Sequence, residues 1–392
     1  LTNYYPSYDD LYRHGFVHTR MAAYAERGIR ADVFCLQTGQ GLSYDEFHNV
    51  DVITGSQEAL HMLLTTGRYK SVLVHFLDDA MWQVLQHYIG RIKVFVWVHG
   101  SEIQPWHRRD NFENEHQRET AKIKSETRMT FWLGLLRQMP DNLHLIFVSK
   151  YLAAVTMEDL GFRLPDSRYT IIHNAIDTDL YVFHKKSAEQ RKKILSIRPF
   201  ATSTYANDLS VAAILALSKQ PYFKDLEFRI IGDGKLFDEV LAPIRAFDNV
   251  HIERRFLTHV EIATIHREYG IFLCPSRMDS QGVSRDEAMS SGLVPVTNAV
   301  AAIPEFVDET CGMLVPQEDA AGLAESITKL YHSPELFSAM SAAAAARVRR
   351  ESRSTKTIEV ELALFTQEEL ISGHTGRGFK FQVKRLNDDA AA

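Results

Sequence analysis

One stretch, residues 269–316, constrains the fold of this 392-residue chain more than any other. An apolar run from Ile271 to Cys274 predicts a buried parallel strand, which ends at the following proline because proline cannot continue a hydrogen-bond ladder. After a polar loop, a helix is expected to start near Val283 and to end at Gly292, where glycine suits a left-handed C-cap. Residues 293–297 form the next expected strand. Strand, loop, helix and strand in this order predict an α/β fold with a parallel sheet.

The composition indicates a folded protein with more than one core. With 392 residues and 45% hydrophobic content, the chain is long enough for two domains. The net charge of −6 gives no basic footprint of the kind that binds nucleic acid, so we expect no nucleic-acid partner. Three separated cysteines, Cys35, Cys274 and Cys311, lack zinc-site spacing and predict reduced, buried thiols in a cytoplasmic protein. The sequence has no run of about 18 apolar residues, so no membrane-spanning helix is expected.

Strand-like and helical segments alternate along the chain. Residues 1–183 predict a first Rossmann-like domain with a parallel sheet, and residues 194–350 predict a second one. The polar, lysine-rich segment 184–193 has no apolar periodicity and predicts a linker between them. Residues 351–392 are expected to form a C-terminal helix and tail, which either crosses back to the first domain or leads to a further domain. In the first domain, strands are expected at residues 1–5, 52–54, 71–76, 93–98, 143–148 and 169–172.

Polar residues and glycines follow several expected strands of the second domain. Arg198 comes directly after the strand expected at 194–197, and the helix that follows favours anions at its amino terminus. Gly232 and Gly234 form a tight turn after another expected strand, and glycine lets a ligand approach the main chain closely. Because ligands of open α/β sheets bind outside the carboxyl ends of the strands, these residues and the loop 279–282 predict a binding site there.

The spacing between Asp279 and Glu287 resembles the E-x7-E region of glycosyltransferase family 4, retaining group 1 glycosyltransferases with the GT-B fold. The Pro-Ser pair at 275–276, the loop glycine Gly282 and the Glu-Ala-Met sequence from Glu287 match the same pattern. The resemblance covers most of the chain and is strongest from Arg198 to Pro316. It implies two Rossmann-like domains whose parallel sheets face each other across a cleft.

The resemblance also implies a role for each candidate residue. Asp279 and the loop after it would contact the donor sugar, and Glu287 would bind the nucleotide ribose, because a carboxylate accepts hydrogen bonds from two vicinal hydroxyls. Arg198 would neutralise the leaving diphosphate. His99, after the strand expected at 93–98, would donate a hydrogen bond near the reaction centre without acting as the base. Further donor-binding candidates are His14, Gly15, Thr204, Gly232, Gly234, Phe256, Leu257, Ser280, Gln281, Gly282 and Val283.

The chain departs from the family pattern at two positions. The family has a lysine six residues after its arginine, whereas this chain has Thr204, so one of the two cations expected at the diphosphate is missing. Nearby hydroxyls, the helix amino terminus, Arg277 or Arg285 are candidates to compensate, although Arg285 is equally compatible with a surface position. Asp279 is one methylene shorter than the family's glutamate. Either the donor sugar sits deeper, or the loop 280–282 makes the contact.

The resemblance implies a retaining glycosyltransferase that moves a hexose from a nucleotide-diphosphate sugar to a glycan or lipid-linked glycan, with no metal or other cofactor. The expected setting is O-antigen or capsule synthesis in the cytoplasm, at the inner face of the membrane. A catalytically decayed GT-B binding or scaffolding module is the alternative that Thr204 and Asp279 favour, and a GT-B epimerase or phosphorylase is a third. Arg108 and Arg109 either face the acceptor or belong to a solvated surface. The chain starts at Leu1, so we expect it to be part of a longer chain, whose basic tail contacts a membrane or links to another domain.

Overall fold

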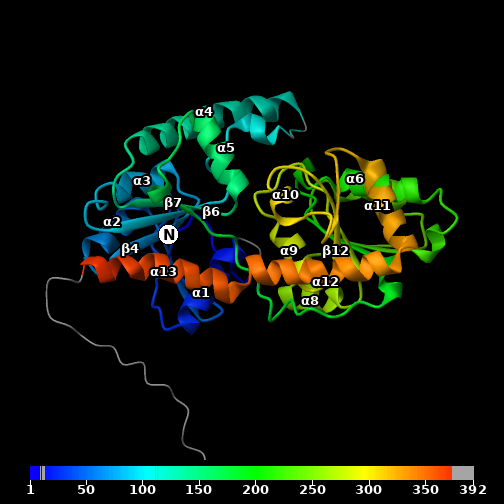
Figure 1. Cartoon of the computed structure of the whole chain (residues 1–392). Coiled ribbons are helices and arrows are strands. Elements are labelled where there is room, and N and C mark those ends of the chain that lie inside the picture. The colour runs from blue at the N-terminus through cyan, green and yellow to red at the C-terminus, as the bar shows by residue number, and fades with distance from the viewer. Residues whose placement is uncertain (9, 11–13, 111, 113, 373–392) are drawn as a thin grey trace, which may run out of the picture.

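Two α/β domains lie side by side in the polypeptide, each with a central sheet flanked by helices (Figure 1). The computed structural model describes residues 1–372 except 9, 11–13, 111 and 113, and describes side chains as far as residue 365. The prediction for the basic tail therefore lies outside the described residues. None of the helices in the described ranges is long and apolar enough to cross a membrane.

The first domain contains seven named strands: β1 (Val33–Leu36), β2 (Ser43–Phe47), β3 (Val50–Gly55), β4 (Ser71–His75), β5 (Lys93–Val98), β6 (Leu143–Phe147) and β7 (Tyr169–Ile171). Strands β4, β5, β6 and β7 form a parallel sheet in that order, and β1, β3 and β2 form a second sheet. The first residues of the chain join the two sheets, because Thr2 N donates to Phe34 O at 3.0 Å and His75 N donates to Leu1 O at 2.9 Å. Residues 1–5 were expected to end a strand, and residues 1–2 occupy a strand position between β1 and β4.

Strand β2 is the element of this domain that the sequence did not predict. It pairs with β3 in antiparallel register, from Ser43 opposite Thr54 to Phe47 opposite Val50. The two-residue turn between them, His48 and Asn49, has positive φ at both positions (46° and 64°), which is the geometry that a tight hairpin requires. Four of the five residues of β2 are exposed, so the strand lacks the apolar alternation from which strands are predicted.

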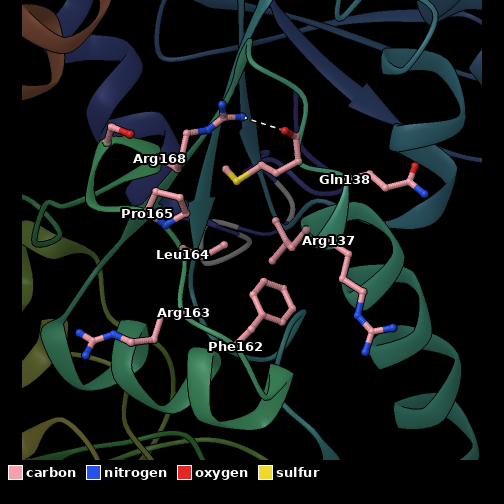
Figure 2. Close-up of a pocket in the computed structure, with 10 residues that line it drawn as sticks. Arg137, Gln138, Phe162, Arg163, Leu164, Pro165 and Arg168 are labelled. Carbon is pink, nitrogen blue, oxygen red and sulfur yellow. Dashed lines mark hydrogen bonds between the residues drawn. The ribbon is translucent and has the colours of Figure 1, made fainter.

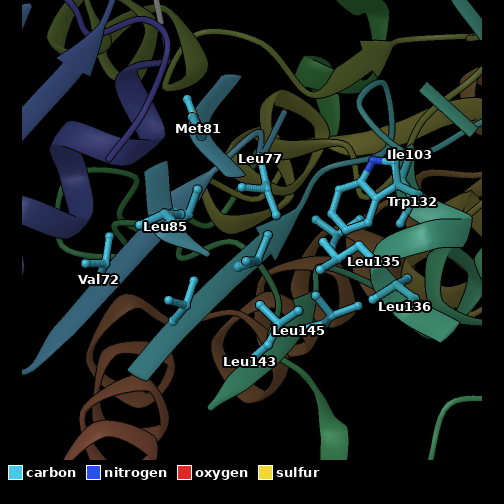
Figure 3. Packing of buried hydrophobic residues seen from close by; sticks show 14 of the residues in the cluster. Val72, Leu77, Met81, Leu85, Ile103, Trp132, Leu135, Leu136, Leu143 and Leu145 are labelled. Atoms are coloured by element: carbon cyan, nitrogen blue, oxygen red, sulfur yellow. The ribbon is translucent and has the colours of Figure 1, made fainter. Parts of the chain in front are cut away.

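The main core of the first domain lies between its parallel sheet and the helices α2 (Gln57–Thr65), α3 (Asp79–Leu85), α4 (Glu115–Arg137) and α5 (Lys150–Leu160). Helix α1 (Gly15–Glu26) packs in a separate apolar cluster with β1, β2 and β3. Figure 3 shows Trp132, Leu135 and Leu136 of α4 packed with strand residues such as Leu143 and Leu145. Trp132 is fully buried, and its Nε1 donates to Glu102 O at 2.6 Å. This hydrogen bond ties the loop after β5 to the core.

The second domain has one parallel sheet of six strands in the order β10-β9-β8-β11-β12-β13. Its strands are β8 (Lys193–Ile197), β9 (Glu227–Gly232), β10 (Val250–Arg254), β11 (Ile271–Leu273), β12 (Val294–Asn298) and β13 (Met313–Val315). Its helices are α6 (Asn207–Leu217), α7 (Phe237–Leu241), α8 (His259–His266), α9 (Val283–Ser290), α10 (Ile303–Phe306), α11 (Ala320–His332) and α12 (Pro334–Glu351). Strands β11 and β12 are short and entirely buried, as expected for central parallel strands, whereas β13 lies at the edge of the sheet and is only partly buried. The helix α9 starts and ends within two residues of the positions that the sequence predicted.

The last helix, α13 (Ser354–Ser372), runs from the second domain along the first, where Figure 1 places it beside α1. Arg20 of α1 and Glu361 of α13 form a buried ion pair at 3.0 Å, and the hydroxyl of Tyr24 donates to the same carboxylate. Both charged side chains are at most 2% exposed, and breaking a buried pair of this kind leaves an uncompensated charge. The two domains are therefore joined at this end by a buried contact as well as by the chain.

Candidate functional site

The loops that follow β5 and β11, one from each domain, are in contact. Gly100 follows β5 with a φ of 121°, and a Cβ placed on it would lie 2.6 Å from Ser280 Oγ. A Cβ there would have to displace the Ser280 hydroxyl and would sit on a backbone with positive φ, so glycine suits this close approach. The contact brings the loops of the predicted residues His99, Asp279 and Ser280 together. We refer to residues 99–109 of the first domain together with residues 198–205 and 279–287 of the second as the interdomain face.

Gln281 fixes the loop after β11 to the first domain. Its Nε2 donates to Asn174 O and to Asp286 Oδ2, each at 3.1 Å, and its Oε1 accepts from Asn174 N at 2.5 Å. The residue is 2% exposed, so this predicted donor-binding side chain is held inside the protein. Gln281 positions the loop, and its predicted contact with the donor stays a prediction.

A buried polar network extends from this loop to the last helix. Arg20 Nη2 donates to Asn174 Oδ1 at 3.1 Å, in addition to its ion pair with Glu361. At the other end, Asp286 pairs with Arg285 at 2.7 Å. The network therefore connects α13, α1, the turn after β7, the loop after β11 and α9 through side chains that are all less than 9% exposed.

A second polar contact between the domains lies at Glu305 in α10. Its carboxylate accepts hydrogen bonds from the backbone amides of Lys150 at 3.0 Å and Tyr151 at 3.1 Å, at the amino terminus of α5. His173 Nε2 lies 3.4 Å from the same carboxylate. These hydrogen bonds hold the pKa of Glu305 below its ordinary value despite partial burial. A carboxylate from one domain thus caps a helix of the other.

The predicted histidines belong to an aromatic cluster at the strand ends of the first domain. The ring of Phe76 is stacked on His14 at 4.2 Å and on His99 at 4.6 Å between centroids, and Phe16 lies 4.7 Å from His99. Burial and the charge of Arg20 hold the pKa of His99 well below its usual range, and burial lowers the pKa of His14 to about 4. Both imidazoles are therefore neutral near pH 7, where they act as hydrogen-bond partners and not as cations.

His99 is held in one orientation by hydrogen bonds on both sides. Its Nε2 lies 3.1 Å from His75 Nδ1, and its backbone N–H donates to Glu102 Oε1. Gly15 begins α1 next to His14, and a Cβ on Gly15 would meet no atom within 4 Å.

Arg198 lies directly after β8 and is only 6% exposed. Its Nη1 donates to Ser284 Oγ at 3.1 Å, and its guanidinium lies over the Tyr205 ring at 5.0 Å from the centroid. Arg198 Nε is buried without a hydrogen-bond partner in the described part of the chain. A buried cation with an unused donor is the arrangement expected of an anion-binding arginine.

Both arginines that are candidates to compensate for Thr204 already pair with carboxylates. Arg277 forms ion pairs with Asp208 at 2.7 Å and with Glu318 at 2.8 Å. Arg285 is 2% exposed and paired with Asp286, with its guanidinium over the Phe306 ring at 5.2 Å. The surface alternative for Arg285 is therefore wrong. Thr204 itself uses its carbonyl oxygen to accept from Arg277 N at 2.8 Å and Ser276 Oγ at 3.1 Å.

The two predicted acids lie in different surroundings. Asp279 Oδ1 accepts from Gln281 N at 3.1 Å and so shapes the loop that it begins. Glu287, one helical turn into α9, is 8% exposed, and burial together with the charge of Asp286 raises its pKa to about 8. Its side chain is hydrogen-bonded to Tyr181, and His259 Nδ1 lies 3.8 Å from its Oε1. Without a ligand, Glu287 is mostly protonated at neutral pH.

The glycine turn after β9 is required by packing within the protein, and its expected approach to the donor stays a prediction. A Cβ on Gly232 would lie 2.0 Å from Arg198 O, and one on Gly234 would lie 2.3 Å from the carbonyl carbon of Phe200. Both glycines therefore admit the protein's own loop 198–201 and hold Arg198 in place. For the base pocket, Phe256 is 55% exposed, whereas Leu257 is buried in the core. Val283 packs against a neighbouring apolar cluster.

The sequence did not distinguish Arg108 from Arg109, and the structure does. Arg108 is held by Asp159 and Glu158, each at 2.9 Å, as in the solvated alternative. Arg109, at the end of the short helix η1 (Trp106–Arg109), turns instead toward the interdomain face. Its Nη2 lies 3.1 Å from the position of a Cβ on Gly100. Nothing in the sequence pattern gave a signal for this difference.

Two cavities of about 570 Å³ each lie in the first domain, and none of the predicted site residues lines either of them. One lies between the end of α4, the end of α5 and the segment before β7, where Figure 2 shows Phe162 and Leu164 between Arg137 and Arg163. Its third arginine, Arg168, donates to Asp141 and to the carbonyl oxygen of Met139. Among the described residues, no group of three or more His, Cys, Asp or Glu side chains is placed to hold a metal ion.

Comparisons with known proteins match the segment that contains Arg198, Asp279 and Glu287. Residues 191–333 match the model of the family described as Glycosyl transferases group 1. An uncharacterised glycosyltransferase of Methanocaldococcus jannaschii is 28% identical over 116 residues, which are 29% of this chain and 32% of that relative. The matched part thus spans about a third of the length of the curated relative.

Solved structures of glycosyltransferases share the whole architecture. Sucrose-phosphate synthase from Thermosynechococcus elongatus superposes with a TM-score of 0.71 at 16% identity, covering 91% of this chain and 93% of that one. Anabaena HepE in complex with UDP and glucose gives 0.64 at 14% identity, covering 90% and 96%. The pneumococcal O-GlcNAc transferase GtfA, in complex with UDP and GlcNAc, gives 0.59 at 17% identity, covering 84% and 70%. The fold is therefore GT-B, which confirms the predicted fold class.

Proposed function

We propose that this protein is a retaining glycosyltransferase of family 4 that transfers a hexose from a nucleotide-diphosphate sugar to a glycan. The observation that carries the proposal is the position of Arg198 and Glu287. Both are buried at the carboxyl edge of the second sheet, inside the segment that matches the group 1 glycosyltransferases. In open α/β sheets that edge is where nucleotides bind. A bacterial surface polysaccharide, made in the cytoplasm, is the setting that the resemblance to family 4 suggests for the acceptor.

In this proposal the two buried groups bind different parts of the donor. The guanidinium of Arg198, with its unused Nε–H, binds the diphosphate, and Glu287 accepts hydrogen bonds from the ribose hydroxyls. Asp279 and the loop 280–282 border the sugar, and neutral His99 donates to it from the opposite domain. The acceptor hydroxyl attacks on the face from which the diphosphate leaves, and the diphosphate takes up its proton. The protein then contributes position and charge stabilisation, and no side chain is required as a base.

The test is to incubate the protein with UDP-, GDP- and ADP-sugars and candidate acceptors and to measure the released nucleoside diphosphate. Arg198→Gln should reduce turnover at least about 100-fold, because it removes charge stabilisation that grows as the diphosphate leaves. Arg245→Gln is the matched control, since Arg245 is exposed and paired only with Asp238. Normal turnover in Arg198→Gln would refute the phosphate role.

A binding module that has lost catalysis is the second candidate. The specific observation that favours it is the engagement of Arg277 and Arg285 in ion pairs, which leaves Thr204 without the compensation that was expected from the second domain. Such a module would bind a nucleotide or sugar nucleotide but release no diphosphate with any donor and acceptor. The same incubation therefore separates the two candidates.

A further inference from the structure

Arg109 lies where the two domains meet. The position of a Cβ on Gly100 lies 3.1 Å from Arg109 Nη2, 2.6 Å from Ser280 Oγ and 3.2 Å from Gln104 Oε1. The guanidinium, the serine hydroxyl and the amide therefore surround one point between the strand ends of the two sheets. Ser280 belongs to the loop that is proposed to border the donor sugar. Arg109 reaches the same place from the first domain.

The electrostatic surroundings of Arg109 bring it near the loop of Arg198. Its charge interacts with Glu102 and Asp279 and with the side chain of Tyr205, which lies under the guanidinium of Arg198. Arg109 is half-buried, and this burial lowers the pKa of its guanidinium. In the described part of the chain, no carboxylate lies within ion-pair distance of it. A partly buried cation without a paired carboxylate is a favourable partner for an anion.

The orientation of Arg109 is fixed by its neighbours. Its Nε donates to Gln104 Oε1 at 3.0 Å, and Gln104 is itself fully buried. The carbonyl oxygen of Gln104 accepts from Arg128 Nε at 3.1 Å and from Arg128 Nη2 at 2.5 Å. With its Nε directed to Gln104, the guanidinium turns its Nη2 toward Ser280. Arg109 is therefore held before any ligand arrives, which reduces the entropy that binding must cost.

Several buried polar atoms of the same region have no hydrogen-bond partner among the described residues. They are Glu102 Oε2 and Gln104 Nε2 in the first domain and Arg198 Nε and Arg285 Nη1 in the second. Unpaired buried polar atoms are rare in native proteins, and each needs a physical reason. Of these atoms, the Nε–H donor of Arg198, whose guanidinium lies over the Tyr205 ring near Arg109, is the second observation that points to an anion between the domains.

We propose that Arg109 supplies, from the first domain, the second cation for the donor diphosphate that is missing from the second domain at Thr204. The assignment rests on the proposed function. A nucleoside diphosphate carries more than one negative charge, and Arg198 with the amino terminus of α6 offsets only part of it. Arg109 faces the diphosphate from the opposite side, so the anion bridges the two domains. In this chain, one of the two phosphate-binding cations thus belongs to the acceptor-side domain instead of the nucleotide-binding domain.

The experiment compares nucleotide affinities of Arg109→Gln, Arg109→Lys and Arg108→Gln with those of the wild-type protein. The probes are UDP, GDP and ADP, measured by calorimetry, and the nucleoside of whichever binds the wild-type protein most tightly, measured by ligand-observed NMR. Arg108→Gln is the matched control, because Arg108 is the adjacent arginine and is paired with Asp159 and Glu158. Thermal unfolding of each variant establishes that it is folded at the temperature of the measurement.

We expect Arg109→Gln to weaken diphosphate binding about 10- to 100-fold, the range for a charge-assisted hydrogen bond, and to leave nucleoside binding unchanged. Arg109→Lys should recover part of the loss because it keeps the charge, and Arg108→Gln should bind like the wild type. Equal diphosphate affinity in Arg109→Gln and the wild type would overturn the Arg109 assignment alone. Equal losses for diphosphate and nucleoside would also overturn it, because they indicate a general structural role. If none of the three diphosphates binds the wild-type protein, the proposed function fails and the assignment fails with it.

Discussion

Glu287 gives the sharpest prediction because its protonation state and its proposed role conflict. Burial and the charge of Asp286 raise its pKa from 4.5 to about 8, so the carboxyl is mostly protonated at pH 7. A ribose diol that donates two hydrogen bonds needs the carboxylate form. Nucleotide binding should therefore remove about one proton from Glu287. We expect the affinity for the nucleotide to fall up to tenfold for each pH unit below 8, and the change Glu287→Gln to abolish this dependence.

The magnitude follows from the pKa difference. One pKa unit corresponds to about 1.4 kcal/mol, so an increase from 4.5 to about 8 means that ionising Glu287 in the ligand-free protein costs up to about 5 kcal/mol. Because the folded-state pKa is raised, the favourable contribution of this group to stability is fully present below pH 4.5 and is lost as the pH rises to about 8. The difference in unfolding free energy between Glu287→Gln and the wild type should grow by up to about 1.4 kcal/mol per pH unit across that range and then level off.

Calorimetry in buffers of different ionisation enthalpy measures the proton directly. At pH 7, the dependence of the binding enthalpy on buffer should correspond to about one proton released by the wild type, after subtraction of the value for Glu287→Gln. The subtraction removes the contribution of the nucleotide's own phosphate, which also titrates near pH 6. His259, 3.8 Å from the carboxyl, is the other group that can exchange a proton there, and the variant His259→Gln tests its share. Identical proton counts for the wild type and Glu287→Gln would refute the ribose assignment.

Three further changes test how the interdomain face is held. Gly100→Ala should lower stability by about 1–3 kcal/mol in chemical denaturation, because its Cβ would lie 2.6 Å from Ser280 Oγ and its φ is positive. The added change Ser280→Gly should recover part of the loss. Unchanged stability of the single variant would count against the contact. Glu305→Gln should cost about 1 kcal/mol and speed hydrogen exchange of the two capped amides of α5, whereas unchanged exchange would contradict the cap. Glu361→Gln should cost about 3–5 kcal/mol in denaturant unfolding because it leaves Arg20 buried and unpaired. A smaller loss in the double variant with Arg20→Met would confirm the ion pair, and additive losses would exclude it.

The sequence predicted the elements that carry the site better than the contacts within it. The strand 93–98 matches β5, and residues 283–290 lie in α9 as expected, because apolar runs and glycines mark these elements locally. This placed His99 after a strand and Glu287 on a helix without a structure. Strand β2 was not predicted because its exposed residues show no apolar alternation. The cause of the glycine turn after β9 was also missed, since the loop that packs on it is more than thirty residues away in the sequence.

Side-chain partners between domains could not be predicted, because they depend on how two separately folded units meet. Arg108 and Arg109 are adjacent residues of the same type, with nearly the same local sequence. Arg108 nevertheless pairs with α5, whereas Arg109 faces the second domain. Gln281 is another example. Its position in the glycine loop suggested a donor contact, whereas its amide spans to Asn174, a residue 107 positions earlier. A local pattern contains no information about a partner at that distance.

The polar links between the domains explain how cations on opposite sides of the interdomain face are kept in position. The buried network from Glu361 through Arg20, Asn174 and Gln281 ends in the loop that carries Ser280. The Glu305 cap holds the second domain to α5 at a separate place. Neither link involves Arg109 or Arg198, so both arginines stay available for the diphosphate that they are proposed to bind. Two positive charges held near one anion site repel each other until the anion binds. In a rigid frame they cannot move apart, so the bound anion relieves this repulsion and binds more tightly. On this reasoning, the last helix contributes to donor binding by keeping the loop of Ser280 opposite Arg109, although it contacts neither substrate.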